Sequence, residues 1–178
     1  MSHTLIFGFD EQLARWACER IPWASYSPNM RAVGVADGDG PDARLLAVCI
    51  YHNYIPIQQV GGKPWYGLCE VGFASATPRW ATRSTIRSLM SIPFLQYDCR
   101  KVVAIVPSTN EPAIRLLEGI GAKQEGPLRH HFAKGVHACV FGMMRWEFEE
   151  RWKVPRPTTR RPTGTQAHAV VRAATASP

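Results

Sequence analysis

YGLCEVGFASATPRWATRSTIRSLMSIPF, residues 66–94, is the stretch that decides the fold, because its hydrophobic pattern changes from that of a strand to that of a helix. The first nine residues are short and apolar with a single carboxylate, Glu70, which is typical of a strand buried on at least one face. A loop with Pro78 and small hydroxyl residues follows, and apolar residues then recur at helical spacing from Ile86 to Phe94. The predicted order is strand, basic turn, helix.

The basic turn has the composition of an anion-binding site. Arg79 and Arg83 flank Thr82, and Ser84 follows directly before the helix. The N–H groups at a helix N-terminus, with the positive end of the helix dipole behind them, bind anions, and arginines strengthen the attraction. The turn is therefore predicted to hold a phosphate or a pyrophosphate.

On the N-terminal side of this stretch, the sequence predicts one helix and one hairpin. Residues 10–21 carry an apolar stripe at helical spacing, with Asp10 as the N-cap and Pro22 as the end of the helix. Residues 31–37 and 43–54 are β-prone and are joined by an Asp-Gly repeat, which is a strong hairpin signal.

On the C-terminal side, the pattern predicts helix, strand, helix and hairpin. The central helix runs from residue 82 to 96, and residues 101–107 form an apolar run typical of a strand covered on both faces. Residues 108–122 follow as a helix that Asn110 caps and Gly121 ends. The last two predicted strands are residues 122–132 and 138–149.

Composition indicates one soluble domain and a basic tail. The chain has 178 residues, is 46% hydrophobic and contains no run of about eighteen apolar residues, so no membrane span and no membrane partner are expected. The N-terminus lacks the pattern of a signal peptide, and the five cysteines form no CxxC pair, so we expect a cytoplasmic protein with reduced thiols. The domain is predicted to span residues 1–152, followed by a flexible tail, residues 153–178.

The net charge of +7 is concentrated near the C-terminus. All 14 acidic residues lie at or before Glu150, together with fifteen of the 21 basic residues, which leaves the domain close to neutral. The other basic residues follow Glu150 in a Pro-, Thr- and Ala-rich segment. Such a tail either adds salt-sensitive affinity for a nucleic acid or is solvated without a partner.

Residues 5–148 resemble the GNAT superfamily of acyl-CoA-dependent N-acetyltransferases. The similar segments are EVGF at residues 70–73, the turn before TIRSL, and NEPAIRLLEGIGAKQEGPLRHHF at residues 110–132. The last segment resembles the branch that acetylates ribosomal-protein N-termini and small amines. The residues that fit its pattern are Asn110, Gly121, Glu125, Gly126 and Arg129.

The resemblance implies an α/β (α+β) fold and acetyl-CoA as the cofactor. The implied sheet is mixed and mostly antiparallel, has helices on both faces, and has parallel fourth and fifth strands that splay apart around the pantetheine arm. The family's pyrophosphate loop, Gln/Arg-x-x-Gly-x-Gly/Ala, keeps its Arg here but lacks both glycines. The six matching residues, which the resemblance assigns to cofactor binding, are Arg79, Trp80, Ala81, Thr82, Arg83 and Ser84. Trp80 either covers the bound nucleotide or packs on the core.

Glu70 is the first candidate for the general base that accepts the proton of an acceptor amine, because it is the lone carboxylate of an apolar strand. The alternative is an outward-facing strand Glu paired with an Arg. His52 either shares the base role or is a packing residue, and Tyr54 beside it is a candidate for binding the acceptor.

The remaining site residues follow from the family analogy. In the family, a backbone N–H of the fourth strand polarises the thioester carbonyl. The analogy assigns this N–H to Phe73 or Ala74, so both residues are expected at the cofactor. The Tyr that acts as the acid in the family is absent from the helix after the fifth strand. Asn110 is among the nearest polar replacements, and we expect it both to contact the cofactor and to take part in catalysis. No metal is expected, because no cysteine or carboxylate spacing supports a zinc site.

The sequence therefore predicts an acetyl-CoA-dependent N-acetyltransferase that acts on a primary amine of a small molecule, protein or peptide through a ternary complex. Two alternatives stay open. One is a phage Mom-like enzyme that modifies a DNA nucleobase with an acyl-CoA, and the other is a CoA-binding module without turnover. The sequence also leaves a homodimer open.

Overall fold

The computed structural model describes residues 3–38, 40, 43–55, 59–60, 63–64 and 67–154. Three features of the sequence analysis lie wholly or partly outside the described residues. They are Tyr66, the loops at residues 37–41 and 58–64, and the predicted basic tail beyond Val154. In the described part of the chain, no helix is both long and apolar enough to cross a membrane.

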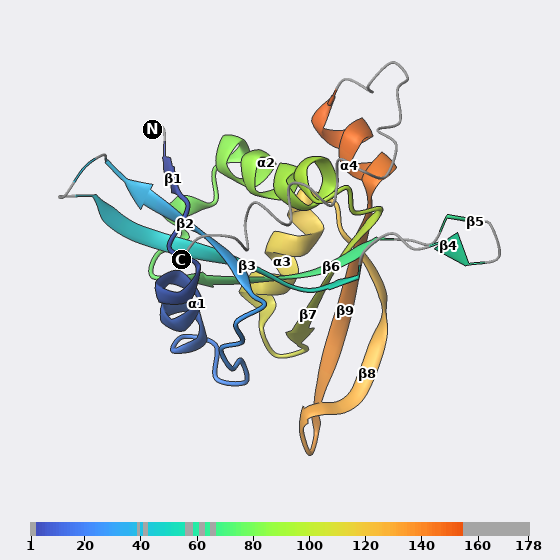
Figure 1. Cartoon of the computed structure of the whole chain (residues 1–178). Coiled ribbons are helices and arrows are strands. Elements are labelled where there is room, and N and C mark those ends of the chain that lie inside the picture. Colours follow the sequence, from blue (N-terminus) through green and yellow to red (C-terminus); the bar gives the residue numbers. More distant parts are fainter. Residues whose placement is uncertain are drawn as a thin grey trace.

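Most of the strands form one seven-stranded sheet with the order β1-β2-β3-β6-β7-β9-β8 (Figure 1). Every neighbouring pair is antiparallel except β6 and β7, which are parallel and are the fourth and fifth strands of this sheet along the chain. The predicted mixed sheet is therefore confirmed. The strands of the sheet are β1 (Thr4–Ile6), β2 (Arg31–Asp37), β3 (Arg44–Ile55), β6 (Leu68–Ser75), β7 (Lys101–Pro107), β8 (Lys123–Ala133) and β9 (Val136–Met144). A separate two-stranded ribbon consists of β4 (Gln59–Val60) and β5 (Lys63–Pro64).

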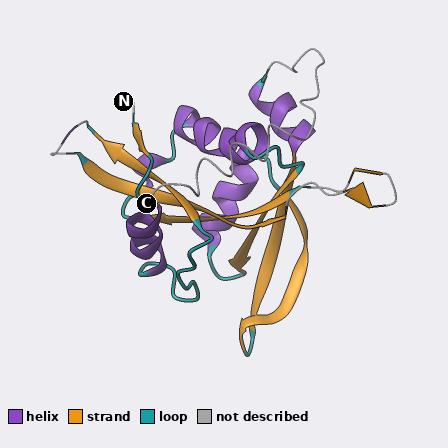
Figure 2. Ribbon diagram, viewed as in Figure 1, coloured by secondary structure: helices purple, strands orange, loops and turns teal. Residues whose placement is uncertain are grey.

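Helices cover both faces of the sheet (Figure 2). Helix α1 lies on one face, and α2, α3 and α4 lie on the other (Figure 1). A π-helical segment, Ile92–Gln96, continues α2. The bounds of the helices are α1 (Asp10–Cys18), α2 (Arg83–Ser91), α3 (Glu111–Ile120) and α4 (Arg145–Trp152).

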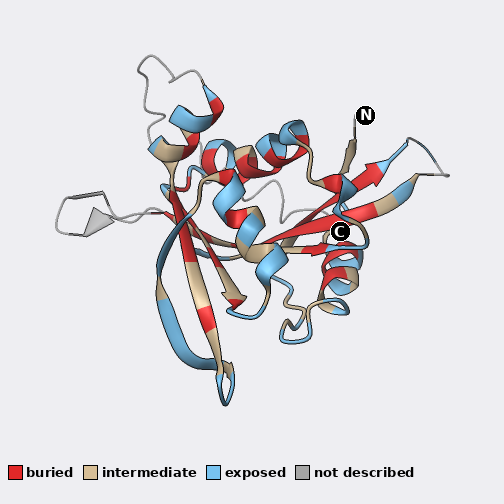
Figure 3. Cartoon of the chain, turned by 180° about the vertical axis from the view of Figure 1, so that it is seen from behind, coloured by how far each residue is buried: buried red, intermediate tan, exposed pale blue. Residues whose placement is uncertain are grey.

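Each face of the sheet carries its own hydrophobic cluster. Figure 3 marks buried residues along the sheet and on the helices that cover it. On the α1 face, Leu13 and Ala17 pack with Val48, Ile50 and Ala74. The larger cluster lies on the other face, where side chains of β6 and β7 meet those of α2, α3 and α4. Strand β8, at the sheet edge, is almost entirely exposed. The residues of β6 thus alternate between two differently packed faces, as the pleat of a strand requires.

The prediction for α3 is confirmed at both ends. The Asn110 side chain accepts a hydrogen bond from the Ala113 N–H at 3.2 Å and caps the helix, whose first turn contains Pro112. Gly121 ends the helix in the left-handed conformation, with φ of 95°.

The prediction for α1 is wrong at both ends. Asp10 is the first helical residue and not the N-cap, because its carboxylate instead accepts the N–H of Ala32 at 2.7 Å, at the start of β2. The helix ends at Cys18, before Pro22.

The last predicted strand is too long. It ends at Met144, and the alternating apolar residues Trp146 and Phe148 belong to α4. The Glu147 carboxylate accepts a hydrogen bond from the Met144 N–H at 2.8 Å. This contact starts α4 at a point where the alternation of apolar residues predicted that the strand would continue.

Candidate active site

The two parallel strands separate exactly where the predicted base lies. Strands β6 and β7 pair only through Leu68 with Lys101, Cys69 with Val102, and Glu70 with Val103. Both strands continue beyond this point, to Ser75 and Pro107 respectively. In the stretch where they are no longer paired with each other, backbone groups on their facing edges are free to bind a ligand between the strands.

Glu70 lies on the α1 face of the sheet. It shares a face with Ala74, which belongs to the α1 cluster, because side chains of a strand alternate. Its neighbours Cys69 and Val71 belong to the cluster on the opposite face. The carboxylate is partly shielded, with 22% of the side chain exposed.

Two consecutive residues of β3 contact the Glu70 carboxylate. His52 lies directly opposite Glu70 in the ladder, with its Nε2 at 3.8 Å from Oε1. The Asn53 side chain donates a hydrogen bond from Nδ2 to Oε2 at 2.8 Å. The predicted His52 and Glu70 are therefore brought together. In the described part of the chain, the Glu70 carboxylate contacts His52 and Asn53 rather than an Arg.

The basic turn is a 3-10 helix, Pro78–Trp80, that leads into α2 without strain. None of the residues 79–84 has a positive φ, so the backbone does not need the glycines that the family pattern has there. Thr82 is the N-cap of α2, and its Oγ1 accepts the Thr85 N–H at 3.3 Å. The Ala81 and Thr82 N–H groups are bonded within the turn, to Pro78 and Trp80 carbonyls.

The start of α2 keeps donors available for an anion. The N–H groups of Arg83 and Ser84 are in the first turn of α2, where a helix has no internal acceptor for them. The Thr82 side chain is turned back toward the helix, where its Oγ1 contacts Thr85 Oγ1 at 2.8 Å. Arg79 is exposed in the turn that precedes these groups. The local geometry is that of an anion cradle.

A surface pocket of about 280 Å³ adjoins this cradle, between α2, α3 and the end of α4. The Arg83 guanidinium lies over the Trp152 ring, 4.8 Å from its centroid. The Trp152 side chain is 6% exposed, and its Nε1 has no hydrogen-bond partner among the described residues. The pocket is lined by Ala81, Arg83, Ile86, Arg115, Leu116, Gly119, Ile120 and Trp152.

Trp80 does not present its ring at the surface. The side chain is 3% exposed and stacks on Phe73, with ring centroids 5.4 Å apart, which agrees with the core-packing interpretation. Ala74 is buried against α1 on the opposite face of β6. Any contact of Ala74 with a ligand between the strands therefore involves its backbone groups.

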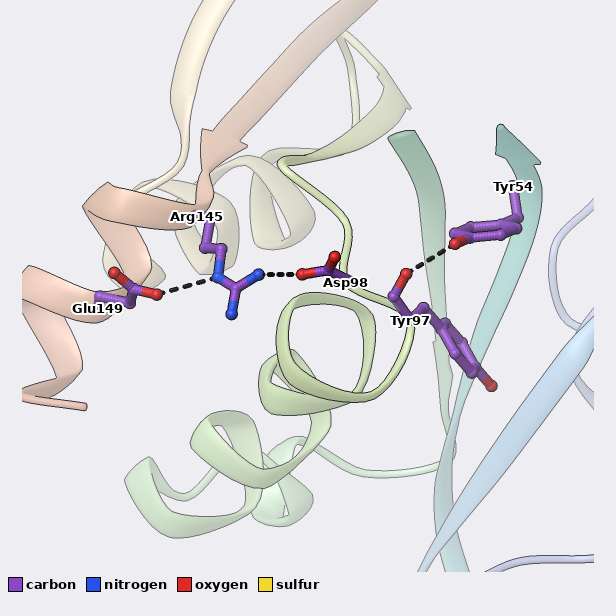
Figure 4. A network of polar contacts seen from close by, with 5 residues as sticks. All are labelled: Tyr54, Tyr97, Asp98, Arg145 and Glu149. Atoms are coloured by element: carbon purple, nitrogen blue, oxygen red, sulfur yellow. Dashed lines mark hydrogen bonds and ion pairs between the residues drawn. The ribbon is translucent and has the colours of Figure 1, made fainter. Parts of the chain in front are cut away.

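Tyr54 and Asn110 lie away from the Glu70 carboxylate. The Tyr54 hydroxyl donates to the Tyr97 carbonyl at 2.7 Å, at one side of a polar network in which Arg145 pairs with Asp98 and Glu149 (Figure 4). Burial, together with nearby Cys99 and Asp98, raises the pKa of Tyr54 to about 12, so this phenol is a weak acid at neutral pH. Asn110 follows β7, which ends at Pro107. Pro107 lies roughly 13 Å along the strand from Val103, the last residue paired with β6, at 3.3 Å per residue.

Sequence reasoning missed three residues of this region: Asn53, Arg115 and Trp152. Asn53 had no periodic signal, because it contacts Glu70 only through a bulge in β3. Arg115 and Trp152 reach the pocket from helices that are distant in sequence from the basic turn. Within the part of the chain that the structure describes, no group of three or more His, Cys, Asp or Glu residues could hold a metal ion.

No protein-family model and no curated protein matches this chain. Solved structures do match its fold. A chimera of spermidine N-acetyltransferase SpeG from Vibrio cholerae and hSSAT has a TM-score of 0.62 at 15% identity, and the match covers 83% of this chain and 99% of that one.

Two further solved structures are similar over most of their length. Arabidopsis thaliana NAA60 in complex with acetyl-CoA has a TM-score of 0.62 at 15% identity, and the match covers 80% of this chain and 97% of that one. Ribosomal-protein-S5-alanine acetyltransferase from Vibrio fischeri has a TM-score of 0.58 at 12% identity, with coverage of 82% and 93%. Together with the parallel strands that separate at Glu70, these matches establish that the chain has the fold of the GNAT acetyltransferases.

Proposed function

We propose that this protein is an N-acetyltransferase that transfers the acetyl group of acetyl-CoA to a primary amine by direct attack in a ternary complex. One observation carries the proposal. The β6–β7 ladder stops at Glu70, and β6 then leads to the anion cradle at the start of α2. A thioester that is anchored by its diphosphate on the α2 face can thus pass between the strands toward a carboxylate on the α1 face.

The cradle supplies the groups that an acyl-CoA requires. The N–H groups of Arg83 and Ser84 and the guanidinium groups of Arg79 and Arg83 would hold the diphosphate. The pocket between α2 and α3 would take the rest of the nucleotide, where Arg115 offers a further donor. These donors suit a polyanionic ligand.

The residues at the strand separation suit aminolysis of a thioester. Glu70 accepts a proton from the acceptor amine, directly or through a water, so that the nitrogen lone pair can attack the acyl carbon. A C–N bond forms, the C–S bond breaks, and the leaving thiolate takes a proton from water. His52, at 3.8 Å from the same carboxylate, would face the acceptor.

Backbone donors at the separated part of β6 would stabilise the charge on the acyl oxygen. The N–H groups near Phe73 and Ala74 belong to the stretch that β7 no longer pairs. Preorganised N–H donors of this kind typically contribute about 3 kcal/mol to transition-state stabilisation. Asn110 remains a candidate for contacting the cofactor, beyond the end of β7 where the strands have separated. Its side-chain oxygen caps α3.

The test is a thiol-release assay with acetyl-CoA against polyamines, peptides with a free N-terminus and duplex DNA. We expect release that depends on a primary amine, and a fall in kcat of about a hundredfold in Glu70→Gln, with a small change in the KM for acetyl-CoA. Glu118→Gln, which alters another exposed carboxylate, on α3, is the matched control.

The possible outcomes separate the three functions. Binding of acetyl-CoA without thiol release from any acceptor would favour a binding module. Release that requires DNA would favour the nucleobase-modifying alternative. Release that is the same in wild type and Glu70→Gln would show that Glu70 is not the base.

A further inference from the structure

Strand β3 contains an extra residue directly after the pair formed by His52 and Glu70. In the ladder with β6, His52 pairs with Glu70 and Ile55 pairs with Leu68, so three steps along β3 match two steps along β6. This is a β-bulge. Asn53, the residue after His52, has a φ of 49°, which lies in the left-handed region.

The bulge places two consecutive side chains at one carboxylate. In a regular strand His52 and Asn53 would point to opposite faces of the sheet. Here the left-handed residue reverses that alternation, so that Asn53 Nδ2 donates to Glu70 Oε2 at 2.8 Å while His52 Nε2 lies 3.8 Å from Oε1. The two carboxylate oxygens therefore have different environments.

We propose that Asn53 is a positioning residue that orients the Glu70 carboxylate for catalysis, an inference that rests on the proposed acetyl transfer. The Nδ2 donor occupies Oε2 and stops the carboxylate from rotating. Oε1 is then the oxygen that remains to accept a proton, on the side that faces His52.

Asparagine meets two requirements at this position. Asn and Asp tolerate a positive φ better than most other residues with a Cβ, and Gly adopts it freely. An Asp would place a second negative charge against Glu70, and a Gly would supply no donor. Compared with Asp and Gly, Asn combines the backbone conformation with a neutral donor.

Two variants separate the amide from the backbone. Asn53→Gly keeps the left-handed conformation and removes the donor, and we expect kcat to fall about fivefold with an unchanged KM for acetyl-CoA. Asn53→Asp keeps the shape but replaces the donor by an acceptor, and its kcat should fall further. Asn29→Gly, in an exposed turn that follows α1, is the matched control and should leave kcat unchanged.

A double-mutant cycle distinguishes positioning from a general structural role. If Asn53 acts through Glu70, Asn53→Gly should have no further effect on kcat once Glu70→Gln is present. The side-chain NH₂ signals of Asn53 in a ¹⁵N NMR spectrum, assigned by their loss in Asn53→Gly, should shift in Glu70→Gln. This second readout does not require activity.

The outcomes also separate this inference from the proposed function. An active wild type that is impaired by Glu70→Gln but not by Asn53→Gly or Asn53→Asp would overturn the role of Asn53 alone. Equal, additive losses from both sites would overturn it as well. Asn53 signals that do not respond to Glu70→Gln would contradict the contact itself. A wild type that transfers no acetyl group to any acceptor, with an intact Asn53–Glu70 coupling by NMR, would instead refute the proposed function and with it the catalytic part of this role.

Discussion

At the scale of single residues, backbone conformation explains where glycine is needed and where it is not. Gly121 has a φ of 95°, and a Cβ built there would lie 2.6 Å from Arg151 Cδ. Gly119, two residues earlier in α3, has no atom within 4 Å of such a Cβ and no positive φ. The same reasoning accounts for the glycine-free turn at residues 79–84, whose backbone stays at negative φ.

These two glycines should therefore respond oppositely to the same substitution. Gly121→Ala should lower the free energy of unfolding by about 1–2 kcal/mol, because an L residue is strained in the left-handed region. Gly119→Ala should raise it by roughly 0.5–1 kcal/mol, because alanine is the better helix former. Urea denaturation of both variants measures the difference. A stabilised Gly121→Ala would show that α3 does not end as described.

A second residue-scale prediction concerns pH. Burial raises the pKa of Glu147, but hydrogen bonds from Lys123 and from the Met144 N–H outweigh it, so the pKa lies below its ordinary value of 4.5. A carboxyl group with a lowered pKa in the folded state stabilises the fold above the unfolded pKa, and this contribution is lost as the pH falls through the folded pKa.

Glu147→Gln should thus cost about 1 kcal/mol of unfolding free energy at pH 7 and much less near pH 3. Urea denaturation at the two pH values measures both differences. Glu150→Gln, an exposed carboxylate of the same helix, is the control and should change stability little at either pH. An equal loss for Glu147→Gln at both pH values would mean that the charge of Glu147 contributes nothing.

At the scale of elements, the proposed anion-binding site lies at the first turn of α2 and not along the rest of the helix. Thr82 caps the helix, Arg79 lies in the turn that precedes it, and Arg83 is its first residue. Arg87 is also exposed on α2 but lies one turn further along. The favourable interaction of an anion with a helix N-terminus falls off within the first turn.

Arg79→Ala should weaken acetyl-CoA binding about tenfold, in line with the loss of one charge-assisted hydrogen bond, whereas Arg87→Ala should change it little. Isothermal titration calorimetry at two salt concentrations measures both effects. The loss from Arg79→Ala should shrink at high salt, because the ions screen an exposed charge. Equal losses from the two variants would indicate a general charge effect and not a local cradle.

At the scale of the whole molecule, α4 holds the sheet and α2 together. Phe148 is fully buried and stacks on Phe94, which follows α2, with ring centroids 4.9 Å apart. Trp152 packs in the same cluster, and the Arg83 guanidinium lies over its ring. Trp146, on the same helix, points outward and is 52% exposed.

Phe148→Ala should therefore destabilise the fold by about 3–5 kcal/mol, whereas Trp146→Ala should cost far less despite the larger side chain removed. Thermal and urea unfolding measure both changes. Similar losses for the two variants would contradict the packing of α4 against the sheet.

Much of the fold followed from local patterns. The hairpin signal between residues 31 and 54, the apolar run of β7 and the capped helix α3 depend on neighbouring residues, and the structure confirms all three. The family resemblance added the parallel strands that separate. Local patterns failed at the ends of α1 and β9, where Asp10 and Glu147 bind backbone groups that spacing alone does not reveal.

By itself, the sequence determined the order of the elements, the basic turn ahead of α2 and the lone carboxylate in an apolar strand, because these depend on residue type and short-range spacing. Only the tertiary structure decided which face Glu70 occupies, that the ladder with β7 ends beside it, and that Asn53 and His52 share its carboxylate. A single bulge residue reverses the side-chain alternation of β3. The register between strands distant along the chain, which sets these contacts, is determined by packing and not by any local pattern.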